Sequence, residues 1–152
     1  MVIIKNCCQI SSLIFIINII IGVYCNYYLY SLLFVILLIT SLIHHSNYTD
    51  FTYITDKISC LYIVLYGILL FYQKVNDNFN ITKTIEQNYL LFSCKNIVFI
   101  SILISFIIVL YLYYYGYYNK QYIFDTDINS AFQYHSIIHY ISCFAHSLIM
   151  LI

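Results

Sequence analysis

The chain has 152 residues, 63% of them hydrophobic and 8% charged, and its formal net charge at pH 7 is zero. It contains no arginine and no basic cluster, which argues against nucleic-acid binding, because clustered lysines and arginines neutralise phosphates. Four stretches carry no charged residue: 6–49, 58–73, 96–119 and 128–152. Apolar segments without charges or a polar face are typical of membrane-spanning helices. The sequence therefore predicts an all-α, multi-pass transmembrane helix bundle in contact with membrane lipids.

Five membrane spans fit the chain as one integral membrane domain, at about 7–25, 27–45, 53–73, 96–118 and 131–152. The first is interpreted as an uncleaved span, because no small-residue cleavage site follows it. The segment 89–118 is either one long helix or two short ones, and a single span from about Asn96 suits the thickness of a bilayer. Too few lysines flank the spans to fix the orientation. Which membrane holds the protein stays open, and an internal one such as the endoplasmic reticulum is a candidate.

Polar side chains occur where a membrane span normally has apolar ones. They are Ser41, His45, Asp56, His135 and His139. Ser41 and His45 are four residues apart at the end of the second span, and His135 and His139 repeat this spacing at the start of the last. Residues four apart lie on one helix face, so each pair presents two polar groups to a neighbouring helix. Asp56 lies at the start of the third span.

The alternation of spans across a membrane predicts that these polar residues meet at one side of it. The second span ends, and the third and fifth begin, on the side of the N-terminus, provided that 89–118 is one span. Three imidazoles, from His45, His135 and His139, with one open coordination position are a known catalytic zinc arrangement. Asp56 is expected to hold or deprotonate the attacking water, and Ser41 to hydrogen-bond near the metal or to an oxyanion.

Each of these residues also has a structural interpretation. A single histidine in a span often hydrogen-bonds to a neighbouring helix, and Asp56 at a helix start is favoured by the helix dipole. His44 faces about 100° away from His45 and is the replacement ligand if the register of the second span differs. His146 lies about 10 Å deeper than His139 and is expected to pack rather than to bind a metal.

The segments SLIHH, ITDKISCLYI and HSIIH together resemble the signature of the CREST superfamily, which includes alkaline ceramidases and adiponectin-receptor-like and myomaker-like proteins. That signature is Ser-x3-His at the end of one helix, Asp at the start of the next, and His-x3-His in the last. The resemblance implies zinc held by His45, His135 and His139, with Ser41 and Asp56 beside it. It also implies hydrolysis of an amide in a lipid such as ceramide. Members usually have seven spans, and a shortened chain of five keeps the same parity.

The leading hypothesis is a small zinc-dependent hydrolase of a lipid amide or ester that enters from the bilayer. The alternative is a non-catalytic structural, receptor-like or membrane-remodelling protein, in which a metal at most joins helices. A third hypothesis is haem held between histidines of the second and last spans. The six cysteines are scattered without metal-ligand spacing and are interpreted as buried thiols. The sequence does not determine the oligomeric state.

Overall fold

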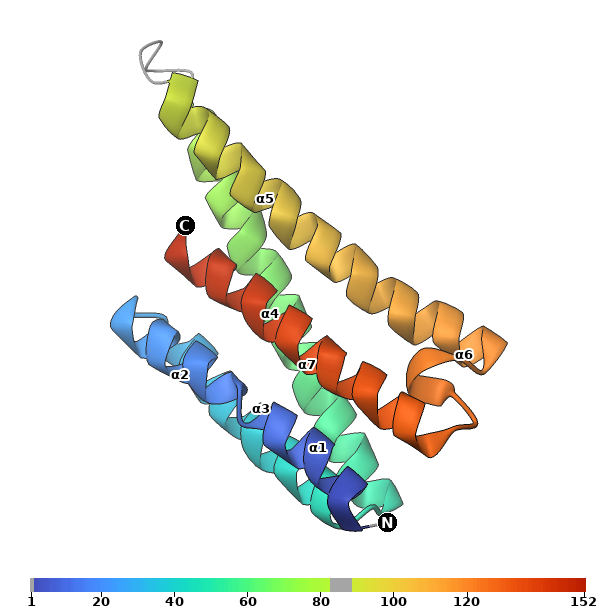
Figure 1. Ribbon diagram of the computed structural model, residues 1–152. Helices are drawn as coiled ribbons and strands as arrows, with labels where there is room; N and C mark the ends of the chain where they lie inside the picture. Colours follow the sequence, from blue (N-terminus) through green and yellow to red (C-terminus); the bar gives the residue numbers. More distant parts are fainter. Residues whose placement is uncertain (1, 83–88) are drawn as a thin grey trace.

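The computed structural model of the protein describes residues 2–82 and 89–152, and the side chains of residues 7–78 and 95–152. Within these ranges the chain forms helices and no strand (Figure 1). The longer helices are α1 (Val2–Ser12), α2 (Phe15–Tyr24), α3 (Tyr28–Ser46), α4 (Asp50–Thr82), α5 (Tyr89–Leu110) and α7 (Ile128–Leu151). Short turns join α5 to α7: the π-helical η1 (Tyr111–Tyr115), α6 (Gly116–Asn119) and the 3-10 turn η2 (Tyr122–Phe124). The prediction of an all-α helix bundle is confirmed.

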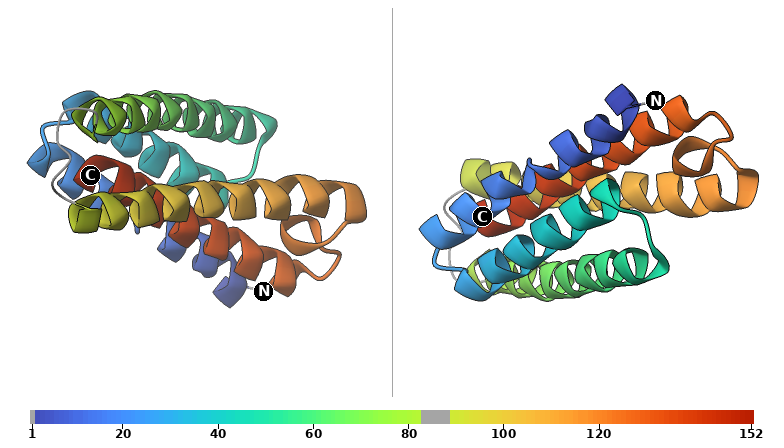
Figure 2. Two further views of the ribbon diagram at one scale, coloured as in Figure 1. Left: turned by 90° about the horizontal axis from the view of Figure 1, so that it is seen from above. Right: turned by 90° about the horizontal axis from the view of Figure 1, so that it is seen from below.

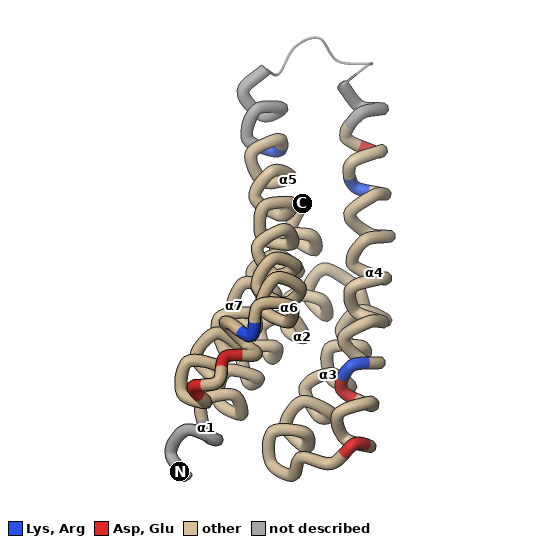
Figure 3. The backbone as a smooth tube through the Cα atoms, turned by 90° about the vertical axis from the view of Figure 1, so that its right-hand side faces the viewer, with Lys and Arg blue, Asp and Glu red and all other residues tan. Residues whose placement is uncertain are grey.

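Four stretches of the described chain are long and apolar enough to cross a membrane: Cys7–Tyr24, Tyr28–Ser46, Asp50–Asn78 and Lys95–Phe124. Charged residues gather toward two ends of the bundle and leave the middle of the helices uncharged (Figure 3). Both features are consistent with an integral membrane protein.

The fifth predicted span, 131–152, coincides with α7 but is not among these four stretches. Three histidines contribute to making α7 less apolar than α2, α3 and α5. It packs against α1, α2, α4 and α5 (Figure 2), so a large part of its surface is covered by protein. Polar side chains on α7 are therefore sheltered from lipid, which explains why this helix tolerates them.

The first predicted span, 7–25, is divided into α1 and α2 by a kink at Leu13 and Ile14. The hydroxyls of Ser11 and Ser12 both donate to the backbone carbonyl of Cys8, over 3.0 and 2.7 Å. Such bonds from serine to the preceding turn often bend helices. At the kink, the backbone N–H groups of Leu13 and Ile14 donate to carbonyls only three residues earlier in the chain, over 3.1 and 3.2 Å. As a result, α1 packs against both α3 and α7.

The third predicted span, 53–73, lies inside α4, a helix of 33 residues. The segment 89–118 is one continuous helical run through α5, η1 and α6. It ends at Lys120, whose φ of 55° is left-handed and stops the helix. The segment therefore forms one helix rather than two short ones. A single helix here is the condition under which the predicted ligands can meet.

The start of α7 is fixed by a cap at Asp127. Its carboxylate accepts hydrogen bonds from the Ser130 hydroxyl and from the backbone N–H groups of Asn129 and Ser130, over 2.9, 3.2 and 3.3 Å. These bonds, led by that of the Ser130 hydroxyl, hold the pKa of Asp127 below its usual value. The cap begins α7 a few residues before the predicted start of the last span, and so sets the register of its histidines.

The core of the bundle is aromatic and encloses His146. Tyr30 and Phe34 of α3 are fully buried, and the Tyr30 hydroxyl is hydrogen-bonded to Nδ1 of His146. The ring centroids of Phe34 and Phe106 lie 5.5 and 5.4 Å from that of His146. Gly67 of α4 permits this packing, because a Cβ there would lie 2.7 Å from the Tyr30 hydroxyl oxygen. His146 therefore has a structural partner, in agreement with the expectation that it packs.

Candidate metal centre

The imidazoles of His45, His135 and His139 converge between α3 and α7. One ring nitrogen of each lies within 4.8 Å of the others. The ring centroid of His45 is 5.0 Å from that of His135 and 5.7 Å from that of His139. His135 and His139 project from one face of α7, and His45 meets them from the last turn of α3. The structure thus brings together the three ligands that the sequence predicts.

The surroundings of this triad fit a bound cation. Nε2 of His45 is buried and has no hydrogen-bond partner among the described residues. A buried polar atom without a partner costs roughly 1–3 kcal/mol, so folded proteins rarely keep one. An ion held by the three imidazoles would engage that nitrogen and keep one coordination position open. A set of three neutral nitrogen ligands suits zinc.

A serine of α1 fixes the orientation of His139. Oγ of Ser11 lies 2.8 Å from Nδ1 of His139 and 3.0 Å from the carbonyl oxygen of Cys8. With its proton given to Cys8, the Ser11 hydroxyl can accept the Nδ1–H of His139. The lone pair of His139 is then on Nε2, which is the state that a metal ligand requires. Sequence reasoning missed Ser11, since nothing in the pattern of the first span distinguishes it from other small polar residues.

Removing this hydrogen bond is expected to weaken zinc binding. Ser11→Ala should raise the dissociation constant for zinc about 10- to 100-fold, the usual effect of losing a partner that orients a ligand. Competition with a zinc-chelating dye in detergent measures this directly. Ser12→Ala is the matched control, because the hydrogen bonds of Ser12 in the described structure go to Cys8 and Ser41 and not to the triad. This variant should bind zinc nearly as the wild type does. Equal affinities of Ser11→Ala and wild type would show that Ser11 does not orient the ligand.

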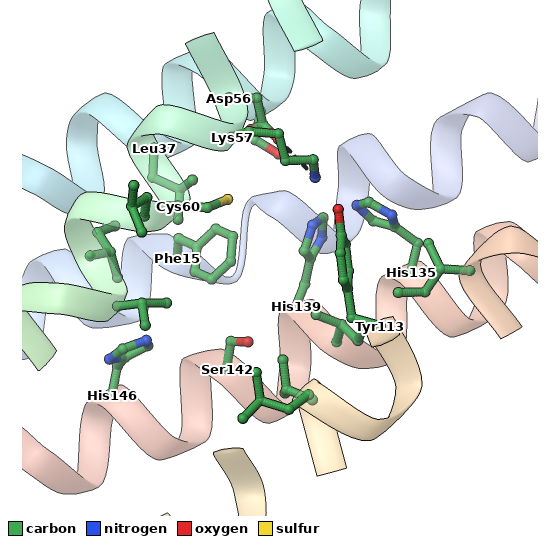
Figure 4. Close-up of a pocket in the computed structure, with 18 of the residues that line it drawn as sticks. Phe15, Leu37, Asp56, Lys57, Cys60, Tyr113, His135, His139, Ser142 and His146 are labelled. Atoms are coloured by element: carbon green, nitrogen blue, oxygen red, sulfur yellow. Dashed lines mark ion pairs between the residues drawn. The ribbon is translucent and has the colours of Figure 1, made fainter. Parts of the chain in front are cut away.

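Asp56 shares a cavity with the two α7 histidines (Figure 4). The residue is 3% exposed, and its Oδ2 lies 3.7 Å from Nζ of Lys57. Its Oδ1 is buried and has no hydrogen-bond partner in the described part of the chain. One carboxylate oxygen is therefore free to accept a proton from water. This placement is compatible with the role that the sequence predicts for Asp56, which stays a prediction.

Ser41 is buried close to α1 and hydrogen-bonds to Ser12. The two hydroxyl oxygens are 2.9 Å apart. Because Ser12 donates to the carbonyl of Cys8, Ser41 is the donor between the two serines. Its hydrogen bond thus holds α3 against α1 in this structure, and the residue also lines the cavity. The predicted catalytic role of Ser41 stays a prediction.

His44, the replacement ligand if the register of the second span differed, lies outside the triad. It is not in the three-histidine cluster found among the described residues. Its ring lies 5.1 Å from that of Tyr48 and 5.8 Å from that of Tyr53, measured between centroids. These contacts place His44 against the connection between α3 and α4, so the register of the second span is the predicted one.

The cavity beside the triad has a volume of about 340 Å³ and two chemically different ends (Figure 4). The polar end is lined by Asp56, Lys57, Tyr113, His135 and His139. The other end is lined mainly by apolar side chains, among them Phe15, Phe34 and Leu37, with the ring of His146 next to that of Phe34. Leu61 of α4 and Leu110 of α5 also line the cavity and are exposed, so it reaches the outer surface between these helices. A membrane around the bundle would cover that surface with lipid.

Two further residues of the polar end were not singled out from the sequence. Lys57 was visible as a charge next to Asp56, but its direction depends on the rotation of α4 about its axis. Tyr113 lies in η1, and its cluster of tyrosines is more simply interpreted as an interfacial aromatic belt. Only the tertiary arrangement of α4 and η1 around the cavity brings the Lys57 ammonium to 5.8 Å from the centre of the Tyr113 ring.

The fold and the cluster together define a class: a helical bundle of membrane-spanning type with a candidate three-histidine metal centre next to an apolar cavity. No protein-family model, curated protein or solved structure matches the chain. The function is therefore inferred from the geometry of the site and from the chemistry of its residues.

Proposed function

We propose that the protein is a zinc-dependent hydrolase of a lipid amide or ester, embedded in an internal membrane such as the endoplasmic reticulum. The main support is the convergence of three imidazoles. Beside them lie two buried atoms without a hydrogen-bond partner in the described chain, Nε2 of His45 and Oδ1 of Asp56. Nδ1 of His44 and Oδ1 of Asn18 are also buried without a partner among the described residues, so the convergence of the imidazoles carries the proposal rather than the unpartnered atoms. The resemblance of the SLIHH, ITDKISCLYI and HSIIH segments to the CREST superfamily supports the same activity.

Each residue of the site has a separate role in hydrolysis. His45, His135 and His139 hold the ion, and Ser11 orients His139. Zinc in this position supplies a Lewis acid that polarises a carbonyl and makes water more acidic. Asp56 takes a proton from the attacking water at Oδ1 and passes it to the leaving amine or alcohol. Water thus adds its hydroxyl to the acyl carbon, the bond from that carbon to nitrogen or oxygen breaks, and a fatty acid is released.

The shape of the cavity supports a lipid as the substrate. Its apolar end, around Phe15, Phe34 and Leu37, can hold a hydrocarbon chain while the bond to be cleaved lies at the histidines. Pockets of this kind, largely apolar with a few convergent polar groups, are typical of small-molecule sites. The contact of the cavity with the outer surface between α4 and α5 gives a lipid a route from the bilayer without passing through water.

The proposal is tested on detergent-purified wild-type protein by metal analysis and by release of fatty acid from a panel of neutral and charged lipid amides and esters. We expect about one zinc ion per chain, loss of fatty-acid release after chelation, and recovery when zinc is returned. Bound zinc without turnover on a panel of lipid amides and esters would favour the non-catalytic alternative, in which the metal joins α3 to α7. A Soret absorption band in the preparation would instead show that the histidines bind haem.

A further inference from the structure

Lys57 is the one lysine that lines the cavity within the described residues. Its side chain leaves α4 next to Asp56 and directs its amine toward Tyr113 and His139 (Figure 4). The side chain is 32% exposed. A lysine within a membrane-spanning helix is costly, and such ionisable residues usually have a functional partner.

The ammonium group of Lys57 has contacts but no close hydrogen bond to an acceptor in the described structure. Its nearest anion is Oδ2 of Asp56 at 3.7 Å, well beyond the roughly 2.7–2.9 Å of a charge-assisted hydrogen bond. It also lies 5.5 and 5.8 Å from the ring centres of Tyr53 and Tyr113, within the range of a cation–π contact. An ammonium has three donors, so Lys57 keeps donor capacity that faces the cavity.

The charges of the site are also unbalanced once zinc is present. The carboxylate of Asp56 and the ammonium of Lys57 cancel, and the three histidines that hold the metal are neutral. The double positive charge of zinc then has no counter-charge among the residues that line the cavity. Uncompensated charge is strongly disfavoured in an apolar environment. An occupant with a negative charge would reduce this cost, whereas a neutral lipid would not.

We propose that Lys57 binds a carboxylate on the leaving-group side of the substrate, so that the enzyme acts on N-acyl amino acids rather than on neutral amides such as ceramide. This inference rests on the proposed hydrolase function. The acyl chain lies in the apolar end of the cavity, the amide lies at the histidines, and the carboxylate lies at Lys57. Hydrolysis gives the hydroxyl of water to the acyl carbon and its other hydrogen to the amide nitrogen. The products are a fatty acid and a free amino acid, without any redox step.

Two probes that differ only in charge test this inference: N-oleoylglycine and the neutral N-oleoylglycinamide. Binding is measured by calorimetry in detergent, and turnover by the release of oleate. The wild type should prefer the acid about ten- to hundredfold, the effect expected of a hydrogen bond to a charged group. Lys57→Met should bring the ratio of the two affinities close to unity, and Lys57→Arg should preserve most of the preference because it keeps the charge.

Lys74→Met is the matched control, since it removes another α4 lysine that contacts Tyr27, 5.4 Å from its ring centre, and does not line the cavity. It should leave the preference unchanged. Equal binding of the two probes by the wild type, or a preference that survives in Lys57→Met, would overturn the inference and reduce Lys57 to a structural partner of Asp56. Cleavage of both probes at equal rates would overturn it while leaving the hydrolase intact. Preferential binding of the acid without any cleavage would instead refute the hydrolase and retain Lys57 as an anion-binding residue.

Discussion

Replacing His135 and His139 together with alanine is expected to abolish both zinc binding and hydrolysis. The double variant keeps only His45 of the three imidazoles, and one neutral ligand cannot hold zinc against the chelating buffer in which the protein is dialysed. Zinc per chain, measured by plasma mass spectrometry, should fall from about one to near zero. Release of fatty acid from lipid amides should fall below detection, because the chemical step depends on the metal.

Two neighbouring histidines of α3 provide a matched comparison for this result. His45→Ala removes a ligand and should also lose most of its zinc, whereas His44→Ala removes a buried imidazole one position away that is outside the triad. The His44 variant should keep its zinc, which separates metal loss from general damage to the end of α3. Stoichiometric zinc in the His135→Ala/His139→Ala variant would show that these residues are not the ligands.

Asp56→Asn is expected to remove turnover while the metal stays bound. Asparagine has nearly the same size but cannot take a proton from water, and loss of a general base typically lowers rates about 10²- to 10⁴-fold. The measurement is the initial rate of fatty-acid release, with zinc content determined on the same sample. The three imidazoles are unchanged in this variant, so its zinc per chain should equal that of the wild type.

Asp50→Asn is the control for the Asp56 experiment, because Asp50 is the exposed acid in the first turn of the same helix and does not line the cavity. It should retain both zinc and activity. Full activity of Asp56→Asn would contradict the role of Asp56 as the base. Loss of zinc along with activity would show that Asp56 acts as a metal ligand instead.

Much of the candidate site could be predicted from the sequence because its ligands follow helical periodicity. The spacing of His135 and His139 places them on one face of any helix that contains both. Their meeting with His45 required only that the chain run back and forth along the bundle with 89–118 as one helix, as it does. The predicted boundaries differ most at α4, which continues past the predicted end at 73 to Thr82, and at α5, which begins at Tyr89 rather than at about 96. Side chains account for two other differences: the kink beside Ser11 and Ser12, and the cap at Asp127.

The sequence by itself determined the all-α fold, the long apolar helices and the spacing of the candidate histidines, because charge distribution and residue spacing are local properties of the chain. Their convergence depended on 89–118 being one helix, which the tertiary structure decided. Only the tertiary structure decided which groups support them. Ser11 reaches His139 across 128 residues of sequence because α1, bent at the serines, packs against α7. Ser41 donates to Ser12 because Ser12 is already bonded to Cys8. Such contacts depend on how helices rotate and compete for hydrogen bonds, and periodicity along one helix carries no information about either.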